Sequence, residues 1–366
     1  MKVLAILTGK MHFDGITNSV LNYYRAMERS DMQIGIVSAR GTDYEMKKSF
    51  EDIGCMTYIL ENRDSDTIKY FFRLVQIIKK EKYDIVHVHG NSATLAIETT
   101  AALLAGCKIR IVHSRNSFCE HVKADKVLRP LLYATYTDGF ACGEKAGKWL
   151  FGNRSFTIIN NGKNIEKFLF KSDIRAEYRQ KLKVDDNQVL LGHVGLFHRQ
   201  KNHSFLIKVF AKICEKNDRY RLVLIGDGEG RPDIEKLVQE KRIQDKVYFL
   251  GSCSNIEKWL QALDVMVFPS LFEGMPNVVL EWQIAGLPAI ISDTITKECK
   301  IMNSVKYLPL EAGSEVWAEE ILKTEITDRN KNQEEIYHAF EKAGFDINRN
   351  AVMLKRIYME LLEKRE

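Results

Sequence analysis

A short segment of the chain places two carboxylates beside a turn that suits an anion. Glu273 follows the apolar strand expected at Asp264–Pro269, and Glu281 lies about one turn into a helix expected to begin near Asn277. Gly274 lets the backbone approach a ligand, because glycine has no side chain. The first N–H groups of a helix and the positive end of its dipole favour phosphate. The residues of this candidate binding turn are Gly274, Met275, Pro276 and Asn277.

Other residues with suitable chemistry also follow expected strands. Lys201 is a cation soon after the strand expected at Val189–Leu196, and Gly226 begins a Gly-Asp-Gly turn after the strand expected at Arg221–Ile225. Gly15 lies beyond the first expected strand, in a loop that leads into a helix. Ligands of parallel sheets bind at the carboxyl ends of the strands, so these residues are candidates for a binding site.

Histidines mark two strands of the first half of the chain. His87 and His89 alternate along the strand expected at Asp84–His89, so both point to one face of the sheet. Hydrogen-bonded structural roles are the expectation for this pair. His113 and Arg115 lie at the end of a later strand, where a side chain could also reach a ligand.

Short β-branched runs alternate with segments of helical periodicity in both halves of the chain, which predicts parallel, doubly wound sheets. We expect a Rossmann-like domain at 1–165, a second at 166–346, and a terminal helix at 347–366 that packs on the first domain. The other strands are expected at Val3–Leu7, Ile34–Ser38, Thr57–Leu60, Arg110–His113, Gly139–Cys142, Thr157–Asn160, Val247–Leu250 and Ala289–Ser292. The other helices are expected near 17–28, 67–80, 92–104, 126–135, 204–214, 232–241 and 256–262.

Composition excludes several classes of protein. The chain has 366 residues, of which 45% are hydrophobic, enough for two cores. The seven cysteines form no C-x-x-C pair, and neither metal-ligand spacing nor a two-aspartate metal motif is evident. The first apolar run is too short for a signal peptide, and no run suits a membrane span. A cytosolic protein is therefore expected, and the absence of a basic-aromatic module argues against a nucleic-acid partner.

The charge is concentrated in the first half, because residues 1–165 carry net +6 and the remainder carries −1. Ordinary solvated surface is one explanation, and attraction to anionic lipid or to a phosphate-bearing acceptor is the other. The segment Ser114–Tyr136 mixes basic and apolar residues. It could touch a membrane, or it could pack on its own sheet, which is the reading we favour.

The segment from Phe272 to Glu281 resembles the E-x7-E signature of the retaining glycosyltransferases of family 4, which have the GT-B fold. In that fold, two Rossmann-like domains face each other across a cleft. The resemblance implies that Glu273 contacts hydroxyls of the donor sugar and that Glu281 binds the ribose hydroxyls of the nucleotide. It makes 1–165 the acceptor domain and 166–346 the donor domain.

The same resemblance gives roles to residues elsewhere. The segment from Gly192 to Asn202 is similar to a family pattern in which an arginine and a lysine clamp the donor diphosphate. Lys201 matches the lysine, whereas Leu196 stands where the arginine is expected. Gly226 falls in a loop near the nucleotide, and Gly15 matches one glycine of a loop that approaches the donor phosphate.

Many members of the family have an active-site histidine near the end of the strand that contains His113. The alignment is ambiguous by two residues. One register places His113 near the reacting sugar, and the other places Arg115 there.

The expected enzyme transfers a sugar, with retention and without metal or further cofactor, from a UDP-sugar or less readily a GDP-sugar. The acceptor is expected to be a glycan or a lipid-linked oligosaccharide in bacterial surface polysaccharide synthesis, such as capsule formation. Contact with the inner face of a membrane and a partner subunit are further expectations. Two alternatives are a nucleotide-sugar 2-epimerase of the same fold and a non-catalytic glycosyltransferase-like subunit.

Overall fold

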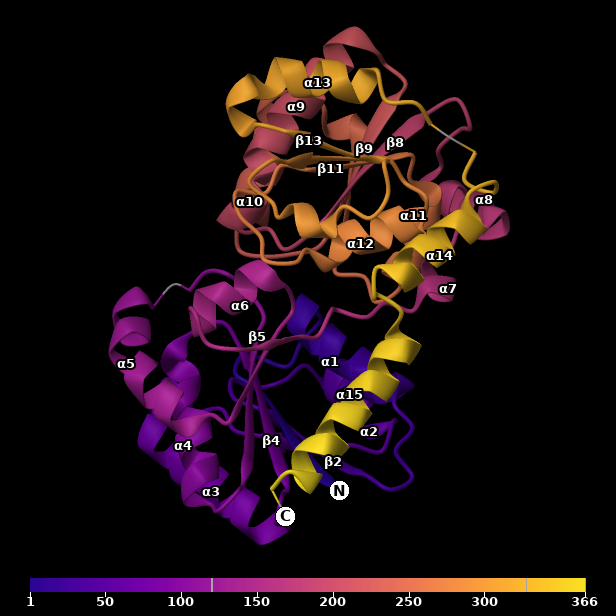
Figure 1. Cartoon of the computed structure of the whole chain (residues 1–366). Helices are drawn as coiled ribbons and strands as arrows, with labels where there is room; N and C mark the ends of the chain where they lie inside the picture. The colour runs from indigo at the N-terminus through magenta and orange to yellow at the C-terminus, as the bar shows by residue number, and fades with distance from the viewer. Residues whose placement is uncertain (120, 327, 366) are drawn as a thin grey trace. The chain divides into compact units, whose positions relative to one another are not determined.

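The computed structural model of the chain describes residues 1–119, 121–326 and 328–365. These residues form two compact units (Figure 1). Unit 1 consists of Met1–Lys163 together with Gly344–Glu366, and unit 2 is Asn164–Ala343. The chain therefore leaves unit 1 and returns to it at its end.

Unit 1 is built on a parallel sheet with the strand order β3-β2-β1-β4-β5-β6-β7. The order reverses between β1 and β4, which makes this pair the switch point of the sheet. Both faces of the sheet are covered, and every residue of β4 is buried, as expected for a parallel strand. The strands are β1 (Lys2–Leu7), β2 (Gln33–Ser38), β3 (Met56–Ile59), β4 (Ile85–Gly90), β5 (Ile109–Ser114), β6 (Asp138–Ala141) and β7 (Thr157–Ile158).

Helices cover this sheet from two sides. One core packs beneath α1 (Gly15–Ala26), α2 (Tyr44–Glu51) and the terminal helix α15 (Ile347–Glu363). The core on the other face is covered by four helices that follow in chain order. They are α3 (Thr67–Glu81), α4 (Ala96–Leu104), α5 (Val122–Thr135) and α6 (Glu144–Phe151).

The terminal helix α15 is fixed at both ends within unit 1. The side chain of Asp346 caps its first turn by accepting from the backbone N–H of Asn348 at 2.6 Å. Near the other end, the buried hydroxyl of Tyr358 lies 2.6 Å from Nδ1 of His87 and 3.3 Å from the hydroxyl of Tyr24. These polar contacts reach the centre of the sheet, so α15 is an integral part of the unit 1 core.

Unit 2 contains a parallel sheet with the strand order β10-β9-β8-β11-β12-β13, whose switch point lies between β8 and β11. The strands are β8 (Val189–Val194), β9 (Tyr220–Ile225), β10 (Val247–Gly251), β11 (Val265–Phe268), β12 (Ala289–Ser292) and β13 (Val305–Leu308). The helices are α7 (Ile165–Phe168), α8 (Ser172–Leu182), α9 (His203–Lys216), α10 (Arg231–Glu240), α11 (Ile256–Ala262), α12 (Asn277–Ile284), α13 (Gly313–Leu322) and α14 (Gln333–Lys342).

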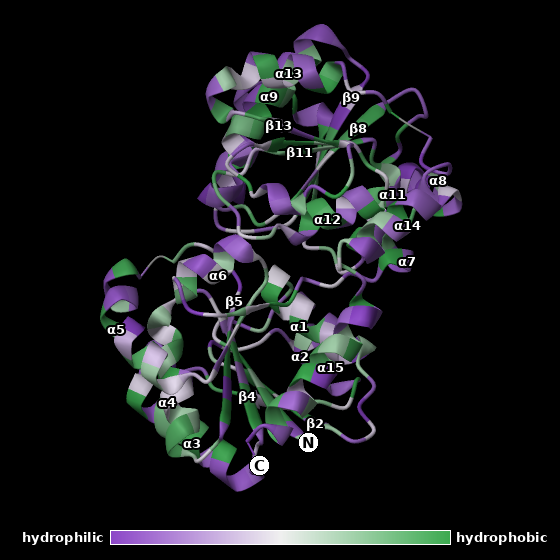
Figure 2. Ribbon diagram, viewed as in Figure 1, coloured by the Kyte–Doolittle hydropathy of each residue, from purple (hydrophilic) through white to green (hydrophobic). Residues whose placement is uncertain are grey.

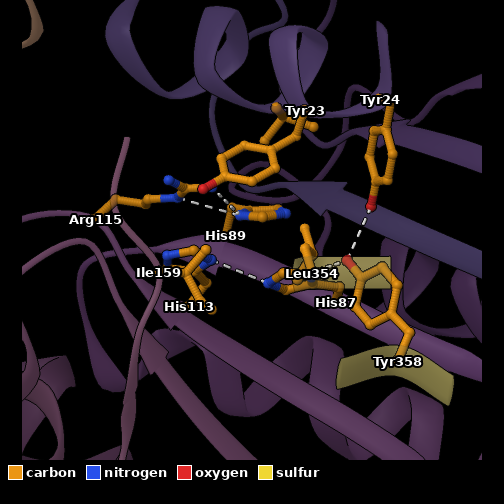
Figure 3. Close-up of a pocket in the computed structure, with 10 residues that line it drawn as sticks. Tyr23, Tyr24, His87, His89, His113, Arg115, Ile159, Leu354 and Tyr358 are labelled. Carbon is orange, nitrogen blue, oxygen red and sulfur yellow. Dashed lines mark hydrogen bonds between the residues drawn. The ribbon is translucent and has the colours of Figure 1, made fainter. Parts of the chain in front are cut away.

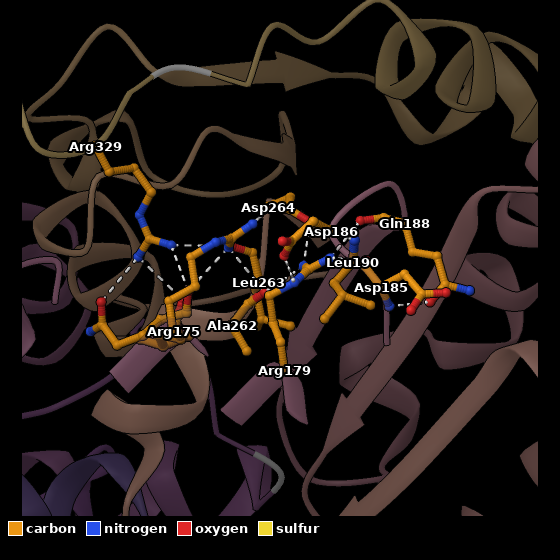
Figure 4. A network of polar contacts seen from close by, with 12 residues as sticks. Arg175, Arg179, Asp185, Asp186, Gln188, Leu190, Ala262, Leu263, Asp264 and Arg329 are labelled. Atoms are coloured by element: carbon orange, nitrogen blue, oxygen red, sulfur yellow. Dashed lines mark hydrogen bonds and ion pairs between the residues drawn. The ribbon is translucent and has the colours of Figure 1, made fainter. Parts of the chain in front are cut away.

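A buried polar network joins several elements of unit 2 at the start of β11 (Figure 4). The carboxylate of Asp264 accepts hydrogen bonds from Arg175 at 2.6 Å, from Arg179 at 3.2 Å and from the backbone N–H of Leu190 at 2.8 Å. Among the described residues, the groups that accept hydrogen bonds from the guanidinium of Arg329 are amide oxygens, including the carbonyl of Ala285 at 2.6 Å. Burial and the nearby charge of Arg175 lower the pKa of Arg329 to about 9.

All the strands predicted from the sequence are present, as are the predicted helices. The sequence analysis did not place α2, α6, α7, α8, α13, α14 or β13. Several of these are short or lie at the edge of a sheet, where periodicity is a weak signal. In the described part of the chain, no helix is long and apolar enough to cross a bilayer.

Candidate active site

The loops after β8 and β11 bring two of the predicted donor-binding residues into contact. Nζ of Lys201 lies 2.6 Å from Oε1 of Glu273, and it also lies 4.6 Å from the ring centre of Phe268. Both charged side chains are largely covered, with 18% of Lys201 and 10% of Glu273 exposed. A cation and a carboxylate therefore meet at the carboxyl edge of the sheet, beside its switch point.

Glycines allow the loops of this edge to approach one another. A Cβ on Gly195 would lie 3.1 Å from the aliphatic stem of Lys201. Gly226 has a φ of +138°, and a Cβ there would lie within hard-contact distance of the carbonyl oxygen of Gly195. The backbone N–H of Gly226 also donates to the carbonyl of Gly251 at 2.8 Å. Gly226 thus packs backbone against backbone beside the lysine.

The predicted binding turn leads into α12, which begins at Asn277 as expected. Pro276 precedes the first helical residue, and Met275 is buried beneath the turn with 9% of its surface exposed. Glu281 lies four residues after the start of the helix and is half-buried. The first turn of α12 contains no acidic residue, so no negative side chain of that turn offsets the positive end of the helix dipole.

Leu196 occupies the position where the family resemblance expects an arginine. Its side chain is 46% exposed, just beyond the end of β8. The neighbouring basic residue Arg199 is exposed, and His198 begins a single 3₁₀ turn, Arg199–Lys201. The loop therefore holds an exposed apolar side chain where a cation is expected.

Three histidines gather in unit 1 beside Arg115 (Figure 3). Nε2 of His87 lies 3.1 Å from Nδ1 of His113, and the rings of His87 and His89 lie 4.1 Å apart. All three rings are buried, with 3% or less of each exposed. They line a cavity of about 10 Å³, which has room for one water-sized particle.

Arg115 lies in the same cluster with 8% of its surface exposed. Its guanidinium donates to Nδ1 of His89 at 3.0 Å, to Oδ1 of Asn161 at 2.9 Å and to Oγ of Ser19 at 3.3 Å. None of these partners is a carboxylate, so within the described part of the chain neutral acceptors hold this buried positive charge. Such an arrangement is costly unless its hydrogen bonds are well made.

The contact with Arg115 fixes the tautomer of His89. A guanidinium only donates, so Nδ1 of His89 is the unprotonated nitrogen and its proton is on Nε2. The ring nitrogens of His87, His89 and His113 lie within 4.8 Å of one another, a spacing that could suit a metal ion. Because Arg115 occupies the free nitrogen of His89 and adds a positive charge beside it, the cluster is a poor cation site.

Burial lowers the pKa of His87, His89 and His113 well below 6.5, and the charge of Arg115 lowers each of them further. The cluster is thus neutral apart from Arg115 at neutral pH. His113 is enclosed in this network, and Arg115 is the member of the predicted pair with the larger exposed fraction. Which of the two faces a reacting sugar remains a prediction.

Gly15 lies apart from the histidine cluster, exposed at the first position of α1. The preceding Asp14 caps the helix by accepting from the N–H of Thr17 at 2.6 Å. The loop between β1 and α1 thus ends at a helix N-terminus on the carboxyl side of the sheet, where ligands of this fold class bind.

The sequence analysis missed three polar residues that build the unit 1 cluster. Ser19 and Asn161 hold Arg115, and Tyr358 holds His87 from a position 271 residues away in the chain. None belongs to a local motif. Only the packing of α1 and α15 on the sheet reveals them.

Two family models match the chain. Residues 174–342 match the model described as Glycosyl transferases group 1, and residues 13–142 match the model described as Glycosyltransferase Family 4. Together they cover most of both units.

Individual relatives agree with these models. EpsF of Bacillus subtilis strain 168, which is named as a glycosyltransferase, is 32% identical over 99% of this chain and 97% of its own length. The UDP-Gal:alpha-D-GlcNAc-diphosphoundecaprenol alpha-1,3-galactosyltransferase of Escherichia coli is 31% identical over 64% of each chain. The crystal structure of Anabaena Alr3699/HepE in complex with UDP and glucose superposes with a TM-score of 0.81 at 18% identity, covering 98% of this chain and 99% of that one. The predicted GT-B fold is confirmed by this likeness.

We expect unit 1 to lose stability as the pH falls below about 6.5. The folded unit keeps His87, His89 and His113 neutral, whereas the unfolded chain binds protons near the ordinary histidine pKa. Each of them contributes a slope of about 1.4 kcal/mol per pH unit below that pH and none above it. Calorimetric unfolding over a pH series measures this slope.

The variant His89→Asn isolates one of these contributions, because asparagine still offers Arg115 an acceptor but does not titrate. Its unfolding free energy should depend less steeply on acid pH than that of the wild type. The matched control is His338→Gln, which replaces a histidine that is 65% exposed and lies in unit 2. An equal slope in the wild type and His89→Asn would contradict the assignment of a depressed pKa to His89.

Proposed function

The chain belongs to the family 4 glycosyltransferases, and we propose that it moves a sugar from a UDP-sugar to a glycan or a lipid-linked oligosaccharide. The solved relative from Anabaena is a complex with UDP, and the relative from Escherichia coli uses a UDP-sugar and a lipid diphosphate by name. These names support UDP over GDP and a lipid-linked acceptor. We propose bacterial surface polysaccharide synthesis as the setting.

The contact between Lys201 and Glu273 carries the proposal for the donor site. In the proposed complex, the ammonium of Lys201 binds the diphosphate, and the carboxylate of Glu273 accepts hydrogen bonds from the sugar hydroxyls. Glu281 binds the ribose hydroxyls, and the first N–H groups of α12 face the phosphate. Gly226, Gly274, Met275, Pro276 and Asn277 complete the proposed donor site.

The reaction breaks the bond between the anomeric carbon and the diphosphate oxygen, and a hydroxyl oxygen of the acceptor bonds to that carbon with retention. Negative charge builds up on the leaving diphosphate, and the hydroxyl proton passes to that diphosphate or to water. Lys201 offsets that charge, which is the step at which a positioned cation lowers the barrier. We propose that no metal is required.

Unit 1 supplies the proposed acceptor side. Arg115 is a cation at the carboxyl edge of the sheet, and its hydrogen-bond partners among the described residues are neutral, which suits it to an anionic group. His113 belongs to the buried histidine cluster that lies beside Arg115. Gly15 has no side chain to cover the N-terminus of α1.

The two alternative functions, a 2-epimerase and a non-catalytic subunit, are not equally well supported. A 2-epimerase is not favoured, because both family models and the relatives named above are glycosyltransferases. A non-catalytic subunit is supported by one observation, the exposed Leu196 in place of a diphosphate-binding cation.

A surface formed by α3, α4 and α5 supports the proposed contact with a membrane. The helices pack side by side in unit 1, α3 on α4 and α4 on α5, and their ribbons include hydrophobic residues (Figure 2). Val127 is 76% exposed, Ile68 is 73% exposed and Phe72 is 59% exposed. Isolated exposed apolar residues are ordinary, but several on adjacent helices form a candidate interaction surface.

The charges on this three-helix surface favour an anionic bilayer. Glu98 and Asp125 are buried in ion pairs with arginines, so they add no exposed negative charge. Lysine and arginine suit such a surface, because their apolar stems lie along it and their charges attract anionic lipid. The exposed charged residues of the three helices are Lys69, Arg73, Lys79, Lys80, Lys123 and Lys126.

UDP should raise the melting temperature of the wild type, because a ligand that binds only the folded state stabilises it. The variant Glu281→Ala should lose most of this rise, since it lacks the proposed partner of the ribose. Thermal shift with UDP and with GDP measures both effects, and Glu240→Ala on α10 is the control. A rise with GDP alone would contradict the choice of UDP, and no rise with either would favour the non-catalytic subunit.

The variant Leu196→Arg should raise donor turnover or leave it unchanged, because it adds a cation where the family resemblance expects one. Release of UDP from UDP-glucose, UDP-galactose and UDP-N-acetylglucosamine, followed with a coupled assay, measures this. The control Leu196→Met keeps an apolar side chain at the same position. A large loss of turnover in Leu196→Arg would show that this loop binds the donor differently from relatives.

The protein should bind vesicles of phosphatidylcholine mixed with phosphatidylglycerol and should bind phosphatidylcholine alone weakly. Replacing Lys123 and Lys126 with glutamine should weaken binding by about fivefold for each lysine. Co-sedimentation measures this, with Lys236→Gln on α10 as the control. Equal binding to neutral vesicles, or none to either, would overturn the membrane contact.

A further inference from the structure

Side chains on either side of the proposed diphosphate-binding lysine tie the loop after β8 to the loop after β11. Nε2 of Gln200 donates to the carbonyl of Phe272 at 2.8 Å, and the N–H of Leu271 donates to the carbonyl of Gln200 at 2.8 Å. Nδ2 of Asn202 donates to the carbonyl of Pro269 at 3.1 Å. We call these three hydrogen bonds the loop clasp.

Asn202 has a second special property, its backbone conformation. Its φ of 55° and ψ of 43° place it in the left-handed region, between the 3₁₀ turn Arg199–Lys201 and the first residue of α9. Asparagine adopts this region more readily than most residues, and glycine does so without penalty. Position 202 therefore requires both a left-handed backbone and a side-chain amide that reaches the neighbouring loop. Asparagine meets both, whereas glycine meets only the first.

The loop clasp lies beside the two charged groups of the proposed donor site, the ammonium of Lys201 and the carboxylate of Glu273. Lys201 stands between the two residues of the clasp in the sequence, and Glu273 directly follows the carbonyl that accepts from Gln200. Nζ of Lys201 and Oε1 of Glu273 lie 2.6 Å apart. The ion pair alone would not hold this spacing once a donor binds, because the diphosphate competes for the ammonium. The clasp uses neither charged group, so it can persist in the complex.

We propose that Gln200 and Asn202 are positioning residues for sugar transfer. They hold the ammonium of Lys201 and the carboxylate of Glu273 at the separation that lets one bind the diphosphate while the other binds the sugar. This inference rests on the proposed function. Neither residue touches the donor, and both act through the loops that carry the two charged groups. Small errors in the position of such groups reduce the rate strongly.

Three variants test the proposal. Gln200→Glu and Asn202→Asp are close in shape but replace the donating amide with an oxygen that repels the facing carbonyl. Asn202→Gly keeps the left-handed backbone and removes only the side-chain donor. The control Gln239→Glu makes the same chemical change as Gln200→Glu on an exposed face of α10.

The readouts separate positioning from a structural role. Turnover of UDP-sugars is measured as UDP release from UDP-glucose, UDP-galactose and UDP-N-acetylglucosamine, and affinity for UDP is measured by calorimetry. We expect the three variants to lose about tenfold to hundredfold in kcat, as for a lost hydrogen bond that leaves a carbonyl unpaired. Their Kd for UDP should change far less, because Lys201 still reaches the diphosphate on its own loop. The control should match the wild type in both.

Amide hydrogen exchange of Leu271 in the ligand-free protein reports on the loop clasp without any reaction. It should be faster in Gln200→Glu than in the wild type.

A kcat in Asn202→Gly equal to that of the wild type would show that only the backbone conformation of Asn202 matters, and it would overturn the positioning role of this residue. Faster exchange with unchanged kcat in Gln200→Glu would overturn the role of Gln200. A wild type that releases UDP from none of the three donors and binds no UDP would instead contradict the proposed function itself.

Discussion

The candidate donor site depends on one constraint, the parallel pairing of β8 with β11. The two strands are neighbours in the sheet, so their following loops emerge at the same edge although they are about 70 residues apart. This places Lys201 against Glu273 and lets the loop clasp connect backbone to side chain across the switch point. The close glycine contacts at Gly195 and Gly226 follow from the same crowding.

Both units bury some arginines beside carboxylates and others beside neutral groups. In unit 2, Asp264 pairs with both Arg175 and Arg179, while Arg329 bonds to main-chain carbonyls at the end of α11 and α12, where the helix dipoles are negative. In unit 1, Arg63 pairs with Glu98, whereas the hydrogen-bond partners of Arg115 among residues 1–119 and 121–163 are amide, hydroxyl and imidazole groups. A charge without a counter-ion is costly to bury, and such charges are often kept for ligands.

Much of the fold was predictable because both sheets are parallel and buried. Strands such as Val265–Phe268 read as apolar runs, and the helices between them show clear amphipathic spacing. The start of α12 at Asn277 was also predictable, since the preceding proline and glycine limit where a helix can begin. Elements such as α6 and β13 were missed. Their short sequences carry little periodicity, and they owe their structure to packing on neighbours.

The sequence alone determined the chemistry available, namely which residues are cations, carboxylates or glycines and the strand each one follows. It also determined the family, because the string around Glu273 and Glu281 is local and complete. Only the tertiary structure decided the partners: Tyr358 with His87, Asn161 with Arg115, and Gln200 with the loop of Glu273. The physical reason is that a hydrogen bond joins groups by distance in space. No local pattern shows which of many distant polar residues the packing of helices on a sheet will bring within 3 Å.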